Sequence, residues 1–180
     1  MAIVFTPETG EGIVDSNSYL SIVDFKAVSD NLGKEYFDYT DDEIKVGFIR
    51  ASTFLDSYFI SRYPGVRNEG QGLEWPRTNA LYLNGEEILD TVVPKEVKIA
   101  LAEAFYILKS GADIQPTIAG NGILKEERVK VDVVEEHKKY NSSSTPKRTT
   151  YTVLEDAMAR LTGGLSSFAN LKIMRVGGFT

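Results

Sequence analysis

Residue types that commonly carry out catalysis are sparse in this sequence. The 180 residues include no cysteine and one histidine, His137, which lies in a charged run from Glu135 to Lys139. A Ser-His-Asp triad needs a buried, oriented imidazole, and a solvated charged run does not provide one. The lack of cysteine excludes disulfides, thiolate metal sites and cysteine nucleophiles, and it fits folding in a reducing cytoplasm.

Three consecutive acids, Asp41, Asp42 and Glu43, resemble a metal-binding cluster. Neighbouring residues on a helix point in different directions, and acids are favoured at the positive N-terminal end of a helix, so capping by Thr40 and Glu43 explains them better. The sequence also lacks a glycine-rich phosphate loop and the HExxH, CxxC and GxSxG patterns. We therefore expect a non-enzymatic protein with no catalytic residue, no cofactor and no metal.

The charge balance is acidic, with 26 acidic and 20 basic residues and a net charge of −6. Nucleic-acid binders usually carry a basic stripe, so this balance argues against DNA affinity while remaining compatible with DNA that slides past. Lys147 and Arg148 form a basic pair, too small for a DNA groove. No apolar run approaches the about 18 residues of a membrane span, and the N-terminus lacks the basic region of a signal peptide, so we expect a soluble chain that is not exported.

Four segments have the signals of helices. Ser21 and Asp24 have the spacing of a capping box before residues 22–32, and Thr40 begins a longer helix over 41–61. A third helix, apolar on most of its surface, is expected over 94–110 with Pro94 at its first position, and a fourth begins near Thr152 with Glu155 completing a capping box. The positions expected to face the core in the second and fourth helices are Ile44, Phe48, Ala51, Leu55, Tyr58, Leu154, Met158 and Leu161.

The remaining segments predict a small amount of β structure. Val129, Val131 and Val133 alternate with charged residues, as in a half-buried strand, and residues 141–148 are a serine-rich loop. We predict a mainly α fold, a small bundle of about four helices in one domain over 1–162. This domain includes a β-arm near 123–140, and an extended C-terminal tail covers 163–180.

The long segment between the second and third helices contains the only tryptophan, Trp75, followed by Pro76 and Arg77. Trp75 either packs as a plug at the end of the bundle, the interpretation we favour, or anchors a partner, since Trp and Arg are enriched at interface hot spots. The C-terminal tail has a short apolar stretch that could add a strand to the sheet of a partner. The candidate interface residues are therefore Trp75, Arg77, Leu171, Ile173, Met174 and Val176.

Several local patterns together resemble one family of phage head-morphogenesis proteins. They are Ser18–Ser21, Ala51–Asp56, Gly65–Arg67, Gln71–Arg77, the Val93-Pro94 pair with its alanine-rich helix, and the strand over 125–134. The Leu-Glu-Trp-Pro-Arg element is the most specific. Members of that family resemble head-tail connector adaptors, although they are often labelled DnaT-like single-stranded DNA-binding proteins.

The resemblance implies a small helical bundle with a β-hairpin or extended β-arm, which serves as a structural adaptor of a tailed phage. It would form a ring of about twelve copies under the portal protein and contact a downstream neck or tail-completion protein. Double-stranded DNA would pass through the ring, and no membrane would be involved. The chain would be located in the virion neck, and in the host cytoplasm before assembly, with the C-terminal tail contacting the portal. Two alternatives stay open: a single-stranded DNA-binding replication accessory protein, and a tail-completion protein lower in the neck.

Overall fold

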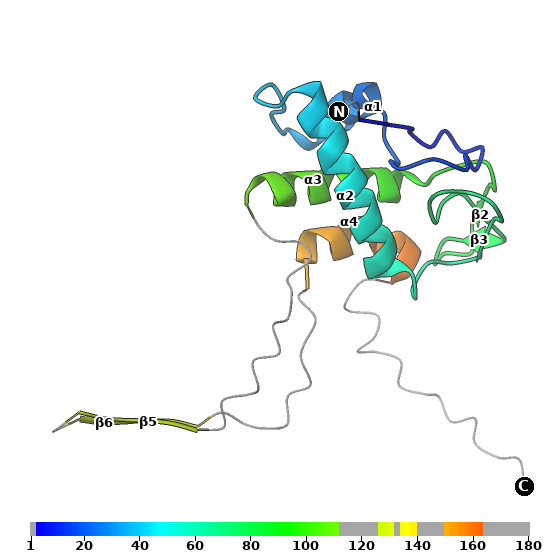
Figure 1. Cartoon of the computed structure of the whole chain (residues 1–180). Coiled ribbons are helices and arrows are strands. Elements are labelled where there is room, and N and C mark those ends of the chain that lie inside the picture. Colours follow the sequence, from blue (N-terminus) through cyan, green and yellow to red (C-terminus); the bar gives the residue numbers. More distant parts are fainter. Residues whose placement is uncertain (1–2, 112–125, 132–133, 140–149, 164–180) are drawn as a thin grey trace, which may run out of the picture. The chain divides into compact units, whose positions relative to one another are not determined.

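The computed structural model describes residues 3–111, 126–131, 134–139 and 150–163, with the two central segments described as backbone only. The described part forms four helices and three two-stranded antiparallel sheets (Figure 1). The helices are α1 (Ile22–Leu32), α2 (Asp41–Phe59), α3 (Lys95–Lys109) and α4 (Thr152–Thr162). The strands are β1 (Val66–Arg67), β2 (Arg77–Thr78), β3 (Ala80–Leu81), β4 (Glu87–Ile88), β5 (Glu126–Val131) and β6 (Val134–Lys139). The predicted mainly α class with a β-hairpin is confirmed.

The chain divides into two compact units. A helical body comprises Met1–Ile114 and Tyr151–Thr180, and a hairpin unit comprises Gln115–Thr150. None of the described helices has the length and apolar character needed to cross a bilayer. The C-terminal stretch predicted to pair as a strand, and the serine-rich loop over 141–148, lie outside the described residues.

The first two helices begin as their capping signals predict. Ser21 accepts a hydrogen bond from the backbone N–H of Asp24, and Gly33 ends α1 in the left-handed conformation at φ 66°. Thr40 and Glu43 form a complete capping box at the start of α2. Helix α2 ends at Phe59, two residues before the predicted end, because the backbone tightens there into a turn closed by the N–H of Arg62 on the carbonyl of Phe59.

Two predicted helix starts need correction. Pro94 is the N-cap of α3 and Lys95 is its first helical residue. Tyr151 is the N-cap of α4 without a side-chain capping bond, so Thr152 is inside the helix. Glu155 does not complete a capping box, because its carboxylate is 1% exposed and receives two hydrogen bonds from Arg62 at 2.6 and 2.8 Å. A long-range ion pair therefore takes the place of the predicted local cap.

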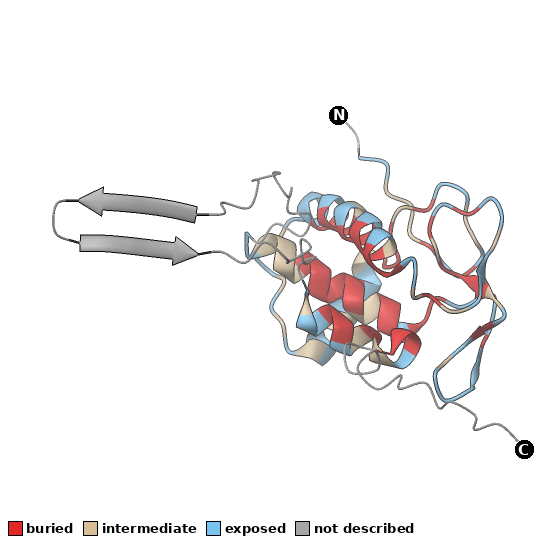
Figure 2. Cartoon of the chain, turned by 90° about the horizontal axis from the view of Figure 1, so that it is seen from below, coloured by how far each residue is buried: buried red, intermediate tan, exposed pale blue. Residues whose placement is uncertain are grey.

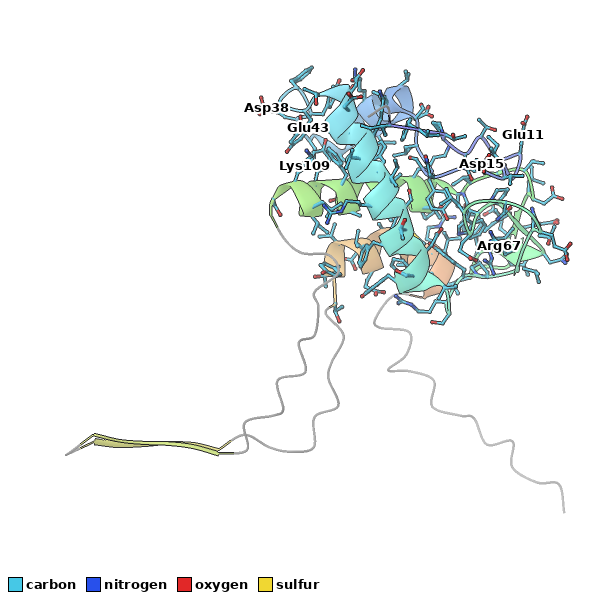
Figure 3. All side chains as sticks on the ribbon, viewed as in Figure 1. Glu11, Asp15, Asp38, Glu43, Arg67 and Lys109 are labelled. Carbon is cyan, nitrogen blue, oxygen red and sulfur yellow. The ribbon has the colours of Figure 1, made fainter. Side chains whose placement is uncertain are left out.

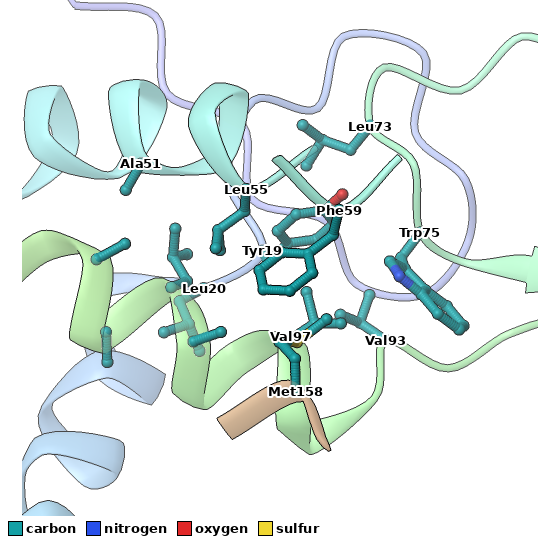
Figure 4. Packing of buried hydrophobic residues seen from close by; sticks show 14 of the residues in the cluster. Tyr19, Leu20, Ala51, Leu55, Phe59, Leu73, Trp75, Val93, Val97 and Met158 are labelled. Atoms are coloured by element: carbon teal, nitrogen blue, oxygen red, sulfur yellow. The ribbon is translucent and has the colours of Figure 1, made fainter. Parts of the chain in front are cut away.

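The core of the body centres on α3, which packs against α2 and α4 and, over a smaller area, against α1. The eight core positions predicted for α2 and α4 are all buried. Figure 2 shows the buried positions on the helix faces that are turned toward one another. Leu55 from α2, Val97 from α3 and Met158 from α4 meet in this core (Figure 4). The central helix predicted over 94–110 is thus confirmed in place and role.

The segment between α2 and α3 contributes the rest of the body. Strands β1 and β2 pair with Val66 opposite Thr78, and β3 and β4 pair with Ala80 opposite Ile88. Trp75, in the loop that connects β1 to β2, is completely buried and joins the same hydrophobic cluster as the helices (Figure 4). The long loop is therefore held to the bundle by its own aromatic side chain.

Candidate functional site

The loop from Gln71 to Arg77 holds two of the predicted interface residues, and both are buried in the folded chain. The ring of Trp75 packs edge-on against Tyr63, with the ring centroids 5.8 Å apart. Arg77 is 7% exposed; its Nε donates to the carbonyl of Pro64 at 2.8 Å and its Nη2 to that of Gly65 at 3.0 Å. Burial of Trp75 is what the plug interpretation predicts, and the burial of both side chains leaves little of either for a partner.

The other polar side chains of this loop also bind its own backbone. Gln71 donates through Nε2 to the carbonyls of Leu73, at 2.8 Å, and Pro76, at 2.9 Å. Arg67, labelled in Figure 3, donates through Nε to the carbonyl of Leu73 at 3.1 Å. Glu74 lies between Arg77, at 2.6 Å, and Arg67, at 3.5 Å. The Leu-Glu-Trp-Pro-Arg element, which is the most specific in the sequence, therefore stabilises the conformation of the loop that contains it.

A half-buried acid, Asp56, which was not among the predicted site residues, joins this loop to α2. Asp56 accepts hydrogen bonds from the hydroxyl of Tyr19 through Oδ1 and from the backbone N–H of Glu74 through Oδ2, the latter at 3.2 Å. Burial raises the pKa of Asp56 to about 7 and outweighs the two hydrogen bonds, which lower it. Burial also raises the pKa of Tyr19 well above its ordinary value.

A carboxyl group with a pKa near 7 could act as an acid or base, but both oxygens of Asp56 are engaged, by Tyr19 and by the backbone of the loop. A cavity of about 340 Å³ lies elsewhere, among Ile3, Val46 and Leu108 and the charged groups around them. Within the described residues, no group of three or more potential ligands gathers in a way that would hold a metal ion. The sequence feature that could have indicated Asp56 is its position directly after Leu55, which belongs to the buried stripe of α2.

Most lysines and arginines in the described part of the helical body form ion pairs with acidic residues of the same body. At least seven of the eleven lysines and arginines in its described part form ion pairs. Lys109 and Glu43, 3.3 Å apart and both labelled in Figure 3, are one such pair, while Glu11, Asp15 and Asp38 are exposed acids. A phosphate backbone would meet few uncommitted cations on this body.

The hairpin unit differs from the body in charge. It has seven basic and five acidic residues, whereas the rest of the chain has 13 basic and 21 acidic residues. In the register of β5 and β6, three positions place opposite charges across from each other: Glu126 with Lys139, Glu127 with Lys138, and Lys130 with Glu135. Such cross-strand pairs favour this register over its alternatives. The valine alternation predicts β5, but it does not predict that the charges on β6 match those on β5.

The two faces of this hairpin differ because residues alternate between faces along a strand. Arg128, Lys130, His137 and Lys139 share one face with two acids, which we call the basic face. Arg128 pairs with His137 in the register, so this cross-strand pair contains no acid. The other face has valines at Val129, Val131 and Val134, grouped at the turn end.

The chain belongs to the family described as "Putative DnaT-like ssDNA binding protein", which matches residues 1–176. No curated protein and no solved structure matches the chain. Membership of this family confirms the DnaT-like part of the resemblance. The family description fits the single-stranded DNA-binding alternative better than the phage adaptor that the sequence analysis put first.

Proposed function

We propose that this chain is a non-catalytic protein that binds single-stranded DNA, and that the hairpin unit makes the DNA contact. The family description supports the activity. The charge distribution supports the location, because the hairpin unit has an excess of cations on a chain that is otherwise strongly acidic. The single observation that carries this location is the basic face of β5 and β6.

Single strands are generally held by cations that follow the phosphates and by aromatic rings that stack on bases. The basic face supplies Arg128, Lys130 and Lys139 in adjoining positions of a two-stranded ribbon. Tyr140 follows Lys139 directly in the sequence and is the only aromatic residue of the hairpin unit. One tyrosine and a few cations predict weak binding that depends strongly on salt and little on base sequence.

Fluorescence anisotropy of a labelled oligonucleotide, titrated with the full-length chain at low and moderate salt, tests this proposal. The hairpin variant combines Arg128→Gln, Lys130→Gln and Lys139→Gln. Its matched control combines Arg50→Gln, Lys26→Gln and Lys95→Gln, which removes the same charges from exposed positions of the body. Circular dichroism verifies that both variants keep their helices.

We expect the hairpin variant to bind at least tenfold more weakly than the control. If three phosphate contacts are lost, the slope of log K against log salt becomes shallower by roughly 2. No binding by the unmodified chain at low salt would overturn the activity. Equal weakening in the two variants would overturn the location on the hairpin.

A structural adaptor of a tailed phage is the second candidate function, as a ring of about twelve copies between the portal and the neck or tail-completion protein. The paired cations and exposed acids of the body favour it, because such a surface lets DNA pass without holding it. A two-stranded hairpin is also marginally stable alone, which favours a neighbouring subunit beside β5 and β6.

Quantitative mass spectrometry of purified phage particles tests the adaptor. A copy number equal to that of the portal subunit supports a neck ring. Absence from particles, with the protein abundant in infected cells, would reject the adaptor and leave single-stranded DNA binding as the function.

A further inference from the structure

An exposed apolar patch lies on the β3–β4 hairpin. Leu81 is 49% exposed, Leu83 is 64% exposed and Leu89 is 63% exposed. Leu81 lies in β3, Leu83 lies in the turn that follows it, and Leu89 comes two residues after Glu87, which pairs with Leu81 across the hairpin. We call these three side chains the leucine patch. Grouped exposed leucines of this kind mark a surface that is covered by another element.

Acidic residues surround the leucine patch. Glu86 and Glu87 lie in its turn and second strand, Asp90 follows Leu89, and all three are exposed. Arg160 is the nearest cation, and it is already engaged with Glu96 at 3.1 Å and with Glu86 at 3.9 Å. An occupant with apolar side chains and positive charge would therefore complement this surface best.

The end of α4 places the start of the C-terminal segment beside this patch. The backbone N–H of Leu83 donates to the carbonyl of Arg160 at 3.1 Å, within the last turn of α4. Gly163 then turns the chain with a φ of 87°. Gly163 is thus only three residues from the backbone contact between Arg160 and Leu83.

Residues 164–180 combine apolar side chains with positive charge, a composition that complements the leucine patch and its acidic border. They contain Lys172 and Arg175 and no acidic side chain. Their large apolar residues are Leu165, Phe168, Leu171, Ile173, Met174, Val176 and Phe179. The eight residues from Gly164 to Leu171 span roughly 28 Å when extended, which is ample for a chain that starts beside the patch to return to it.

We propose that the C-terminal segment of this chain, residues 164–180, docks on the leucine patch of the same molecule, with Lys172 and Arg175 facing its acidic border. The short connection gives the segment a high effective concentration at the patch, which favours its own body over a second copy. Contact of this tail with another protein would then require release from the patch and would expose the leucines at the same time.

Disulfide trapping tests the docking cleanly because the chain has no cysteine of its own. The test variant is the full-length chain with Leu83→Cys and Ile173→Cys, oxidised mildly at low protein concentration. The control variant pairs Ile173→Cys with Val23→Cys, since Val23 is 76% exposed on α1. Intact mass and non-reducing electrophoresis distinguish intramolecular from intermolecular disulfides.

We expect an intramolecular disulfide to form at least tenfold faster in the test variant than in the control, and to slow severalfold when Lys172→Glu and Arg175→Glu are added. Equal rates in test and control variants would overturn the proposal. A disulfide-linked dimer that forms only in the test variant would also overturn it, and would identify a second copy as the occupant.

Discussion

Replacement of Asp56 by asparagine is expected to change how the stability of the protein depends on pH. Burial raises the pKa of this carboxyl group from its ordinary 3.8 to about 7. Because the pKa is higher in the folded state, folding takes up a proton between these values. The stabilisation is full below about pH 3.8 and is lost as the pH rises through 7.

The expected size of the effect follows from the two pKa values. Each unit of pKa difference corresponds to about 1.4 kcal/mol, and integration from pH 5 to pH 8 gives a loss of roughly 2–3 kcal/mol for ionisable Asp56. Asparagine has no charge to bury and retains an acceptor for the hydroxyl of Tyr19. Between pH 5 and pH 8 the stability of Asp56→Asn should therefore rise by roughly 2–3 kcal/mol relative to that of the unmodified chain.

Urea unfolding at pH 5 and pH 8 measures this difference, with the buried Trp75 as the single fluorescent reporter. Asp90→Asn makes the same chemical change at an exposed position and serves as the control. The other ionisable groups are common to the unmodified chain and Asp56→Asn, so their contributions cancel in that comparison. Parallel changes in stability for the unmodified chain and Asp56→Asn would refute a buried carboxyl group with a raised pKa.

Three further substitutions test the packing and capping. Trp75→Ala should lower the free energy of unfolding by about 3 kcal/mol in urea titrations followed by circular dichroism, whereas unchanged stability with loss of assembly would make Trp75 an interface anchor. Gly47→Ala should destabilise α2 by about 1 kcal/mol or more in calorimetry, because a Cβ there would lie 2.6 Å from the ring of Phe105; a gain in stability would contradict this close packing. Thr40→Ala should cost about 1 kcal/mol in thermal unfolding and Thr152→Ala less than about 0.5, and equal losses would contradict the assigned caps.

Helices were predictable because their signals are local. Ser21 and Thr40 cap with residues three positions away, and the apolar stripe of α2 follows the period of a helix. The start of α4 was not predictable in the same way. Glu155 has the spacing of a cap, but its partner is Arg62, 93 residues earlier, and no local pattern carries that information.

The candidate site was predictable only in part. The alternation of valines predicted β5, whereas β6 reads as a polar run whose meaning comes from the register with β5. The buried environment of Asp56 depends on Tyr19 and on the loop around Glu74, which come from distant segments. Of the predicted interface residues, Trp75 and Arg77 are buried, and the four in the C-terminal tail lie outside the described residues.

The direct packing of α3 on α4 has a consequence for how this family can diversify. The two helices contact each other although the entire hairpin unit, Gln115–Thr150, lies between them in the sequence. The helical core is therefore complete without the inserted residues, and doubling the length of such an insertion costs only about 0.6 kcal/mol in loop-closure entropy. Relatives can exchange, lengthen or recharge the hairpin while they keep one body, so a single scaffold can acquire new binding partners through one insertion point.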